Sequence, residues 1–123
     1  FDPLCPLHFM NDLLKKKCLP CEGGVIPFDI SEIHKYQKKV DGWEIIKNDK
    51  NIFFLVKNFK FKNFVESQNF VNQVGQVSEK EGHHPDIKFG WGYATISITT
   101  HAIEGLSEND FILAAKIDKK TNV

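Results

Sequence analysis

The feature that most constrains the fold is a helix stop followed three residues later by a proline. Gly82 comes after valines that repeat at helical spacing, and it has the position of a residue that ends a helix. Pro85 cannot continue a helix and favours an extended backbone for the residue before it. The chain must therefore leave a helix at Gly82 and go on as extended structure.

A hairpin is predicted directly after this proline. Two runs rich in β-branched and aromatic residues, DIKFGW and ATISITT, are joined around Gly92-Tyr93. A hairpin returns the chain close to the point where it left. We therefore expect His101, at the end of the second run, to lie near His83 and His84.

The remaining pattern predicts an α+β fold with the order α-β-β-α-β-β-α. Helices are expected over residues 30–40, 64–81 and 108–118, and strands over 43–48, 51–61, 86–91 and 94–100. Each helix start has a capping residue followed three positions later by an acidic one: Asp29, Asn63 and Ser107. We expect a four-stranded antiparallel sheet with three helices on one face, in one domain over residues 22–118, and a frayed tail over 119–123.

The second predicted strand carries apolar residues on both of its faces. One face has Phe53, Leu55, Phe59 and Phe61, and the other has Phe54 and Val56. Lys57 interrupts the first face, which predicts a bulge or a strand end exposed to solvent. A sheet covered on one side would expose Phe54 and Val56, so we expect a homo-oligomer, either a dimer or a dimer of dimers.

Composition allows one core and argues against several classes of function. The chain has 123 residues, of which 41% are hydrophobic and 11 are phenylalanine. All 16 basic residues are lysine and balance 16 acidic ones, so neither a direct nucleic-acid partner nor an arginine clamp on phosphate is expected. No apolar run approaches the roughly 20 residues that span a bilayer, and we expect no membrane partner. Three cysteines cannot all pair within one chain, which favours a reduced, cytoplasmic setting.

The first 21 residues are predicted to be an N-terminal extension. Residues 1–9 precede the only methionine, Met10, and are either natural sequence or a leader or appended segment ahead of a start there. The extension also has the ligand types and paired spacings of a zinc site: Cys5, His8, Cys18 and Cys21. Coincidental spacing with a structural turn is the favoured interpretation, and no metal is expected.

Three histidines, His83, His84 and His101, predict proton-transfer chemistry, because imidazoles can supply both an acid and a base near neutral pH. Glu79 lies one helical turn before His83 and is expected to orient its ring or favour its charged form. Three imidazoles are also a possible zinc set, but adjacent side chains on an extended segment point apart. A capped loop with surface histidines is a further alternative. His34 is expected on the surface of the first helix.

These residues also resemble a known family. The matching positions are Glu79, His83, His84, Pro85 and Asp86, then Thr99, Thr100 and His101, and finally Gly105, Leu106, Ser107, Glu108 and Asp110. In this order and spacing they closely resemble the pterin-4a-carbinolamine dehydratases, and the resemblance covers roughly residues 18–118. A histidine pair followed by proline, with a third histidine 17 residues after the pair, is far more specific than any single histidine.

The resemblance implies a hydro-lyase that dehydrates 4a-hydroxytetrahydropterin to quinonoid dihydropterin in tetrahydrobiopterin recycling, without metal or organic cofactor. It also implies the site: His83, His84 and His101 as catalytic residues, and Glu79, Thr99, Thr100 and Asp110 as substrate-binding residues. Members form dimers or tetramers, so a homodimer or homotetramer is expected. The alternative is a non-catalytic pterin-binding or dimerisation module of the same fold.

Three positions depart from the animal members of the family. Those members carry an aspartate before the histidine pair, an arginine before the last aspartate and a tryptophan after the motif's acidic residue. Here the three positions are Gly82, Asn109 and Ile87. Microbial members often have a DIKFGWG-type hairpin, so the dehydratase interpretation stands. The pterin contacts and the transcription-factor role of the animal members need not carry over.

Overall fold

The computed structural model describes Leu13 and residues 26–121. Its helices are α2 (Ile30–Gln37), α3 (Phe64–Glu81), the short 3-10 helix η1 (His101–Ile103) and α4 (Glu108–Thr121). Its strands are β1 (Glu44–Lys47), β2 (Phe53–Lys60), β3 (Asp86–Gly90) and β4 (Tyr93–Ile98). The expected α+β order is confirmed. No helix in this part of the chain is both long and apolar enough to cross a membrane.

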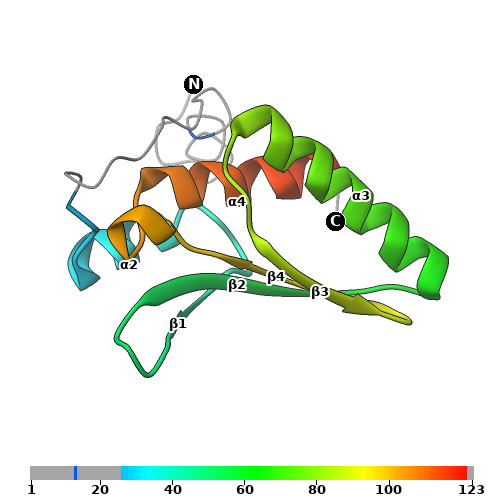
Figure 1. The fold of residues 1–123 in the computed structure, drawn as a ribbon, viewed down its shortest axis with the longest axis horizontal. Coiled ribbons are helices and arrows are strands. Elements are labelled where there is room, and N and C mark those ends of the chain that lie inside the picture. The colour runs from blue at the N-terminus through cyan, green and yellow to red at the C-terminus, as the bar shows by residue number, and fades with distance from the viewer. Residues whose placement is uncertain (1–12, 14–25, 122–123) are drawn as a thin grey trace.

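The four strands form one antiparallel sheet in the order β1-β2-β4-β3. Helices α3 and α4 lie on one side of this sheet (Figure 1). Helix α2 packs against α4, where the ring centroids of Tyr36 and Phe111 are 5.3 Å apart. The two central strands, β2 and β4, are therefore buried on the side that faces the helices. The chain that leaves β4 leads through η1 into α4.

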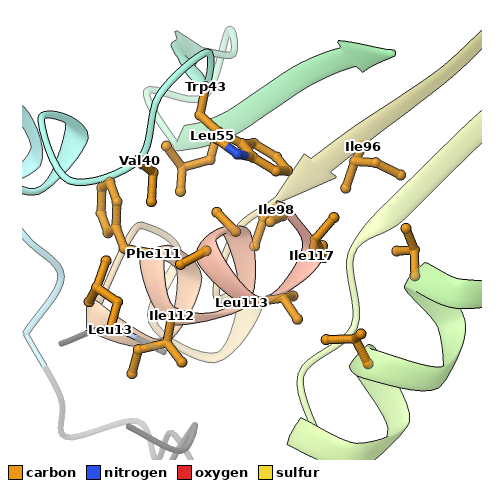
Figure 2. Packing of buried hydrophobic residues seen from close by; sticks show 14 of the residues in the cluster. Leu13, Val40, Trp43, Leu55, Ile96, Ile98, Phe111, Ile112, Leu113 and Ile117 are labelled. Carbon is orange, nitrogen blue, oxygen red and sulfur yellow. The ribbon is translucent and has the colours of Figure 1, made fainter. Parts of the chain in front are cut away.

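The core fills the space between the sheet and the helices (Figure 2). Its largest fully buried side chains come from both layers: Trp43, Leu55, Ile96 and Ile98 from the sheet and its approach, and Phe111, Ile112, Leu113 and Ile117 from α4. Leu13 belongs to the same cluster and is 1% exposed. At this position, the segment predicted to be an extension contributes to the core.

Local capping sets the ends of the helices as the sequence predicts. The side chain of Asp29 accepts a hydrogen bond from the backbone N–H of Glu32 at 2.9 Å, and that of Asn63 accepts one from Glu66 at 2.9 Å. Gly82 ends α3 in the left-handed conformation, with φ 67° and ψ 26°. A residue with a β-carbon is strained there, which is why a glycine marks the stop.

The hairpin turn lies one residue earlier than predicted. Gly90 pairs with Tyr93, so the two turn residues are Trp91 and Gly92. Gly92 has a φ of 78°, which only glycine adopts readily. At the other end, β4 stops at Ile98, and His101 opens η1 and does not end the strand.

Lys57 causes neither a bulge nor a strand end, so that prediction was wrong. It pairs with Ile96 in the unbroken register of β2 with β4, on the side that faces the helices. Its Nζ lies 3.0 Å from Asp118 Oδ1 and 5.0 Å from the centroid of the Phe59 ring. Trp43 Nε1 also donates to Asp118, at 2.9 Å. Burial raises the pKa of Asp118, and the bonds from Trp43 and Lys57 oppose that shift.

Candidate active site

The three motif histidines lie around one hollow in the surface, with a volume of about 280 Å³. The hollow is lined by Gly82, His83, His84, Thr99, Thr100, His101 and Ala102. These residues come from the chain leaving α3 and from the chain leaving β4. The expectation that the hairpin brings His101 back to the histidine pair is confirmed.

A buried carboxylate, that of Asp110 in the first turn of α4, holds one of the three rings. Asp110 is 0% exposed, and its Oδ1 lies 2.7 Å from His83 Nε2. Its Oδ2 accepts hydrogen bonds from the Thr100 hydroxyl and from the backbone N–H of Ser107, each at 2.8 Å. Three donors therefore surround one carboxylate, which offsets the cost of burying its charge.

The contacts of Asp110 determine the role of each nitrogen in the His83 ring. An ionised carboxylate only accepts hydrogen bonds, so His83 Nε2 carries the hydrogen. In the neutral ring, Nδ1 then keeps the lone pair that can take up a proton. A cation formed in this way is stabilised by the carboxylate beside it. The His83 side chain is 14% exposed, so the ring can be reached from outside.

Glu79 pairs with His84 and not with His83, contrary to the prediction from helical spacing. Helix α3 ends just before Gly82, whose left-handed backbone turns the chain so that the His83 N–H bonds back to the Ser78 carbonyl. This turn takes His83 off the helical path. The side chains of His84 and Glu79 are 59% and 78% exposed, so their contact adds little stability.

His101 is held in place by its backbone neighbours. Just before it, Thr100 and Gly105 form an antiparallel bridge, with a Thr100 N–H to Gly105 carbonyl distance of 3.0 Å. Glu104 closes the intervening turn with a φ of 52°. His101 itself is exposed at the edge of the hollow. The end of the sheet and the short turn therefore present the third imidazole to solvent.

The two threonines of the motif direct their hydroxyl groups into the protein. Thr99 Oγ1 lies 2.8 Å from the Phe53 carbonyl oxygen and 3.2 Å from that of Gly105. Thr100 Oγ1 donates to Asp110. Both threonines are 3% exposed. Their hydroxyl protons are thus committed to protein acceptors.

Ser107 belongs to the same network, although the sequence predicted it only as a helix cap. Besides the N–H bond to Asp110, its Oγ lies 3.2 Å from Thr100 Oγ1. The signal was present in the Ser-x-x-Asp spacing, because a capping box brings the fourth residue's carboxylate back to the first residue's N–H. That contact also holds Asp110 within reach of His83.

Within the described ranges, no group of three His, Cys, Asp or Glu side chains is arranged to hold a metal ion. The residues of the alternative zinc site, Cys5, His8, Cys18 and Cys21, lie outside those ranges, as does Met10. His34 is exposed on α2, as predicted, and its Nδ1 is 3.4 Å from the side-chain oxygen of Gln37.

Three comparisons relate this chain to known proteins. A family model described as Pterin 4 alpha carbinolamine dehydratase matches residues 27–120. A Rubrobacter xylanophilus protein named "Putative pterin-4-alpha-carbinolamine dehydratase" is 44% identical over 110 residues, covering 89% of this chain and 99% of the relative. The crystal structure of a transcriptional coactivator/pterin dehydratase from Brucella melitensis has a TM-score of 0.68 and 27% identity, covering 77% of this chain and 98% of that one. The structure of a pterin dehydratase-like protein, identified as a RuBisCO assembly factor in the alpha-carboxysome, has a TM-score of 0.55 and 26% identity. This match covers 65% of this chain and 89% of that one.

The role of Gly82 in ending α3 before the histidine pair can be tested by comparing it with Gly75, a glycine inside the same helix. A β-carbon at Gly75 or at Gly82 would meet nothing within 4 Å, and only Gly82 has a positive φ. We expect Gly82→Ala to lower the free energy of unfolding by about 1–2 kcal/mol, because alanine is strained in the left-handed region. Gly75→Ala should raise it by about 0.5–1 kcal/mol, since alanine favours a helix interior. Urea unfolding of both variants gives the two signs, and equal effects would contradict the assignment of Gly82 as the stop.

Proposed function

Because the chain belongs to the pterin-4a-carbinolamine dehydratase family of hydro-lyases, we propose that it converts 4a-hydroxytetrahydropterin to quinonoid dihydropterin in tetrahydrobiopterin recycling. The observation that carries this proposal is the meeting of three imidazoles at one hollow, with a buried carboxylate behind one of them. Removal of water needs a proton donor and a proton acceptor, and this set of side chains can supply both. The hollow's volume, about 280 Å³, is close to the lower end of the range of small-molecule sites.

The dehydration requires two proton movements. The C4a–O bond breaks with its electron pair on oxygen, which takes up a proton and leaves as water. The N5 lone pair forms the new C4a=N5 bond. The N5–H proton then passes to a base, and its bonding pair becomes the lone pair of N5. Assistance to such transfers by positioned side chains is typically worth about 10²- to 10⁴-fold.

In this scheme His83 is the base. Its Nδ1 takes the proton from N5, and Asp110 stabilises the resulting imidazolium through the 2.7 Å contact at Nε2. One of the other two imidazoles, His84 or His101, protonates the departing oxygen. The turnover ends with one proton more on His83 and one fewer on the acid. Exchange with solvent restores both, which the exposure of His84 and His101 favours.

Glu79 is the residue we propose to contact substrate among the four assigned to binding by resemblance. Its carboxylate is largely exposed beside His84 and can accept a hydrogen bond from a pterin N–H group. Thr99, Thr100 and Asp110 direct their polar atoms to protein partners. We therefore propose that these three shape the site and leave substrate contacts to Glu79 and the histidines.

A non-catalytic role is the second candidate, and one observation favours considering it. A solved structure of similar fold belongs to a pterin dehydratase-like protein identified as a RuBisCO assembly factor. The fold can therefore serve as a binding module. Binding of pterin by this chain with no rate above the uncatalysed dehydration would favour that role over the enzyme.

We also propose that the chain forms a homodimer or a dimer of dimers. On the sheet face opposite α3 and α4, Ile46 is 44% exposed, and Phe54 and Val56 are half-buried. No helix among the described residues covers this face (Figure 1). The outer strands β1 and β3 are sheet edges, which present unpaired backbone groups. Pairing with a second copy across a two-fold axis would extend the sheet and cover apolar surface.

The acid–base assignment predicts the effect of removing either exposed imidazole. His84→Ala and His101→Ala should each reduce turnover by at least about tenfold, because one variant loses the acid and the other loses an imidazole that binds the pterin beside it. The fold should survive, since both side chains are exposed. The measurement is the spectrophotometric decay of 4a-hydroxytetrahydropterin above its uncatalysed rate.

The matched control is His34→Ala, which removes an exposed imidazole from α2, away from the residues that line the hollow. It should retain wild-type turnover. Equal rates for the wild type and both motif variants would rule out the proposed mechanism.

The assembly proposal predicts a light-scattering mass of at least twice the 14.1 kDa of one chain at micromolar concentration. Phe54→Lys should shift this mass toward the monomer, because it places a charge in the apolar face. Asn72→Lys is the control, since Asn72 is an exposed polar residue of α3, which lies on the other side of the sheet. A wild-type mass near 14.1 kDa would contradict the proposal.

A further inference from the structure

We propose that Thr100 is a positioning residue for the reaction, which acts together with Ser107 through Asp110 to hold the His83 ring in one tautomer. This inference rests on the proposed function and gives Thr100 a role other than substrate contact. Its Oγ1 lies 2.8 Å from Asp110 Oδ2, and the residue is only 3% exposed. A buried hydroxyl in contact with a buried carboxylate acts on the substrate only through its neighbours.

The two hydroxyl groups form an ordered chain of donors. The Thr100 oxygen is within reach of both Asp110 Oδ2, at 2.8 Å, and Ser107 Oγ, at 3.2 Å. Thr100 has one hydroxyl proton, and the carboxylate can only accept, so that proton goes to Asp110. The Ser107 hydroxyl must then be the donor to the Thr100 oxygen. The chain therefore runs from Ser107 through Thr100 to Asp110.

This chain fixes which carboxylate oxygen meets His83. Oδ2 of Asp110 already accepts from the Thr100 hydroxyl and the Ser107 backbone N–H, each at 2.8 Å. Rotation of the carboxylate would break both bonds in a site with no access to water, because Asp110 is fully buried. Oδ1 is thus kept toward His83 Nε2, at 2.7 Å. The hydrogen stays on Nε2, and Nδ1 stays available as the base.

Thr100 also connects this ring to the third imidazole. Its backbone N–H and carbonyl pair with Gly105 at 3.0 and 3.4 Å, and the next residue is His101. The side chain therefore positions His83 through Asp110, and the backbone anchors the start of the turn that carries His101. A single buried residue controls the placement of two of the three imidazoles.

The test compares Thr100→Val, which removes the hydroxyl at nearly constant shape, with Thr100→Ser, which restores it. We expect Thr100→Val to lower kcat by about tenfold with KM changed less than about twofold, and Thr100→Ser to recover kcat to within about threefold of the wild type. Thr95→Val is the matched control, because Thr95 lies on β4, five residues ahead of Thr100, and its hydroxyl donates to Asn58 at 2.7 Å, outside the site. It should leave kcat unchanged.

A second readout does not depend on activity. Imidazole ¹⁵N spectra should give His83 as the single Nε2–H tautomer in the wild type and in Thr100→Ser, and as a mixture of tautomers in Thr100→Val. The His83 signals are identified by their loss in His83→Gln. If Thr100→Val does not fold, Ser107→Ala replaces it, since this change removes the outer hydroxyl and keeps the backbone N–H bond to Asp110. It should shift the His83 signals in the same direction by a smaller amount.

Two outcomes overturn the proposal. One is an unchanged His83 tautomer in Thr100→Val or, where that variant does not fold, in Ser107→Ala. The other is a Thr100→Val variant with a raised KM and wild-type kcat, which would make Thr100 a substrate ligand. If the wild type shows no dehydratase activity but its His83 tautomer still depends on Thr100, the proposed function fails and the positioning role stands.

Discussion

A carboxylate with no access to water is stable only where hydrogen-bond donors surround it, and Asp110 is such a group. Its three donors come from separate segments: the His83 ring after α3, the Thr100 hydroxyl after β4, and the Ser107 N–H ahead of α4. Satisfying this one charge requires the three segments to meet. The hollow with its imidazoles forms at that meeting point.

Asp110 can organise the site because the helix that carries it is firmly packed. The residues that follow it in α4 are almost all buried in the core, from Phe111 to Ile117 (Figure 2). The start of α4 is also tied to α2, where the Tyr36 hydroxyl donates to Glu108 at 3.0 Å. Burial, with this hydrogen bond, raises the pKa of Tyr36 to about 12. The Tyr36 hydroxyl therefore stays protonated and remains the donor throughout the neutral range. Burial of α4 and its anchoring by α2 therefore hold the carboxylate in place beside His83.

Local signals predicted most of the fold, because caps, glycine stops and strand periodicity depend on neighbouring residues. The errors arose where distant contacts decide the outcome. Lys57 looks like a break in an apolar face. In the structure its ammonium group donates a hydrogen bond to the carboxylate of Asp118, 61 residues further along the chain, which balances its charge. Glu79 looks like the partner of His83 by helical spacing, yet the left-handed Gly82 moves His83 to Asp110 and leaves Glu79 to His84. The histidines were predicted to meet, but the pairing of each ring with its carboxylate depends on tertiary geometry.

The central claim is that the negative charge of Asp110 makes His83 a base, and Asp110→Asn tests it most directly. Asparagine keeps the shape and one acceptor oxygen but removes the charge that stabilises the imidazolium. Turnover of the folded variant should fall by at least about tenfold. The control is Asp49→Asn, which changes an aspartate in an exposed turn and should match the wild type. An Asp110→Asn protein that folds and retains wild-type turnover would contradict the account.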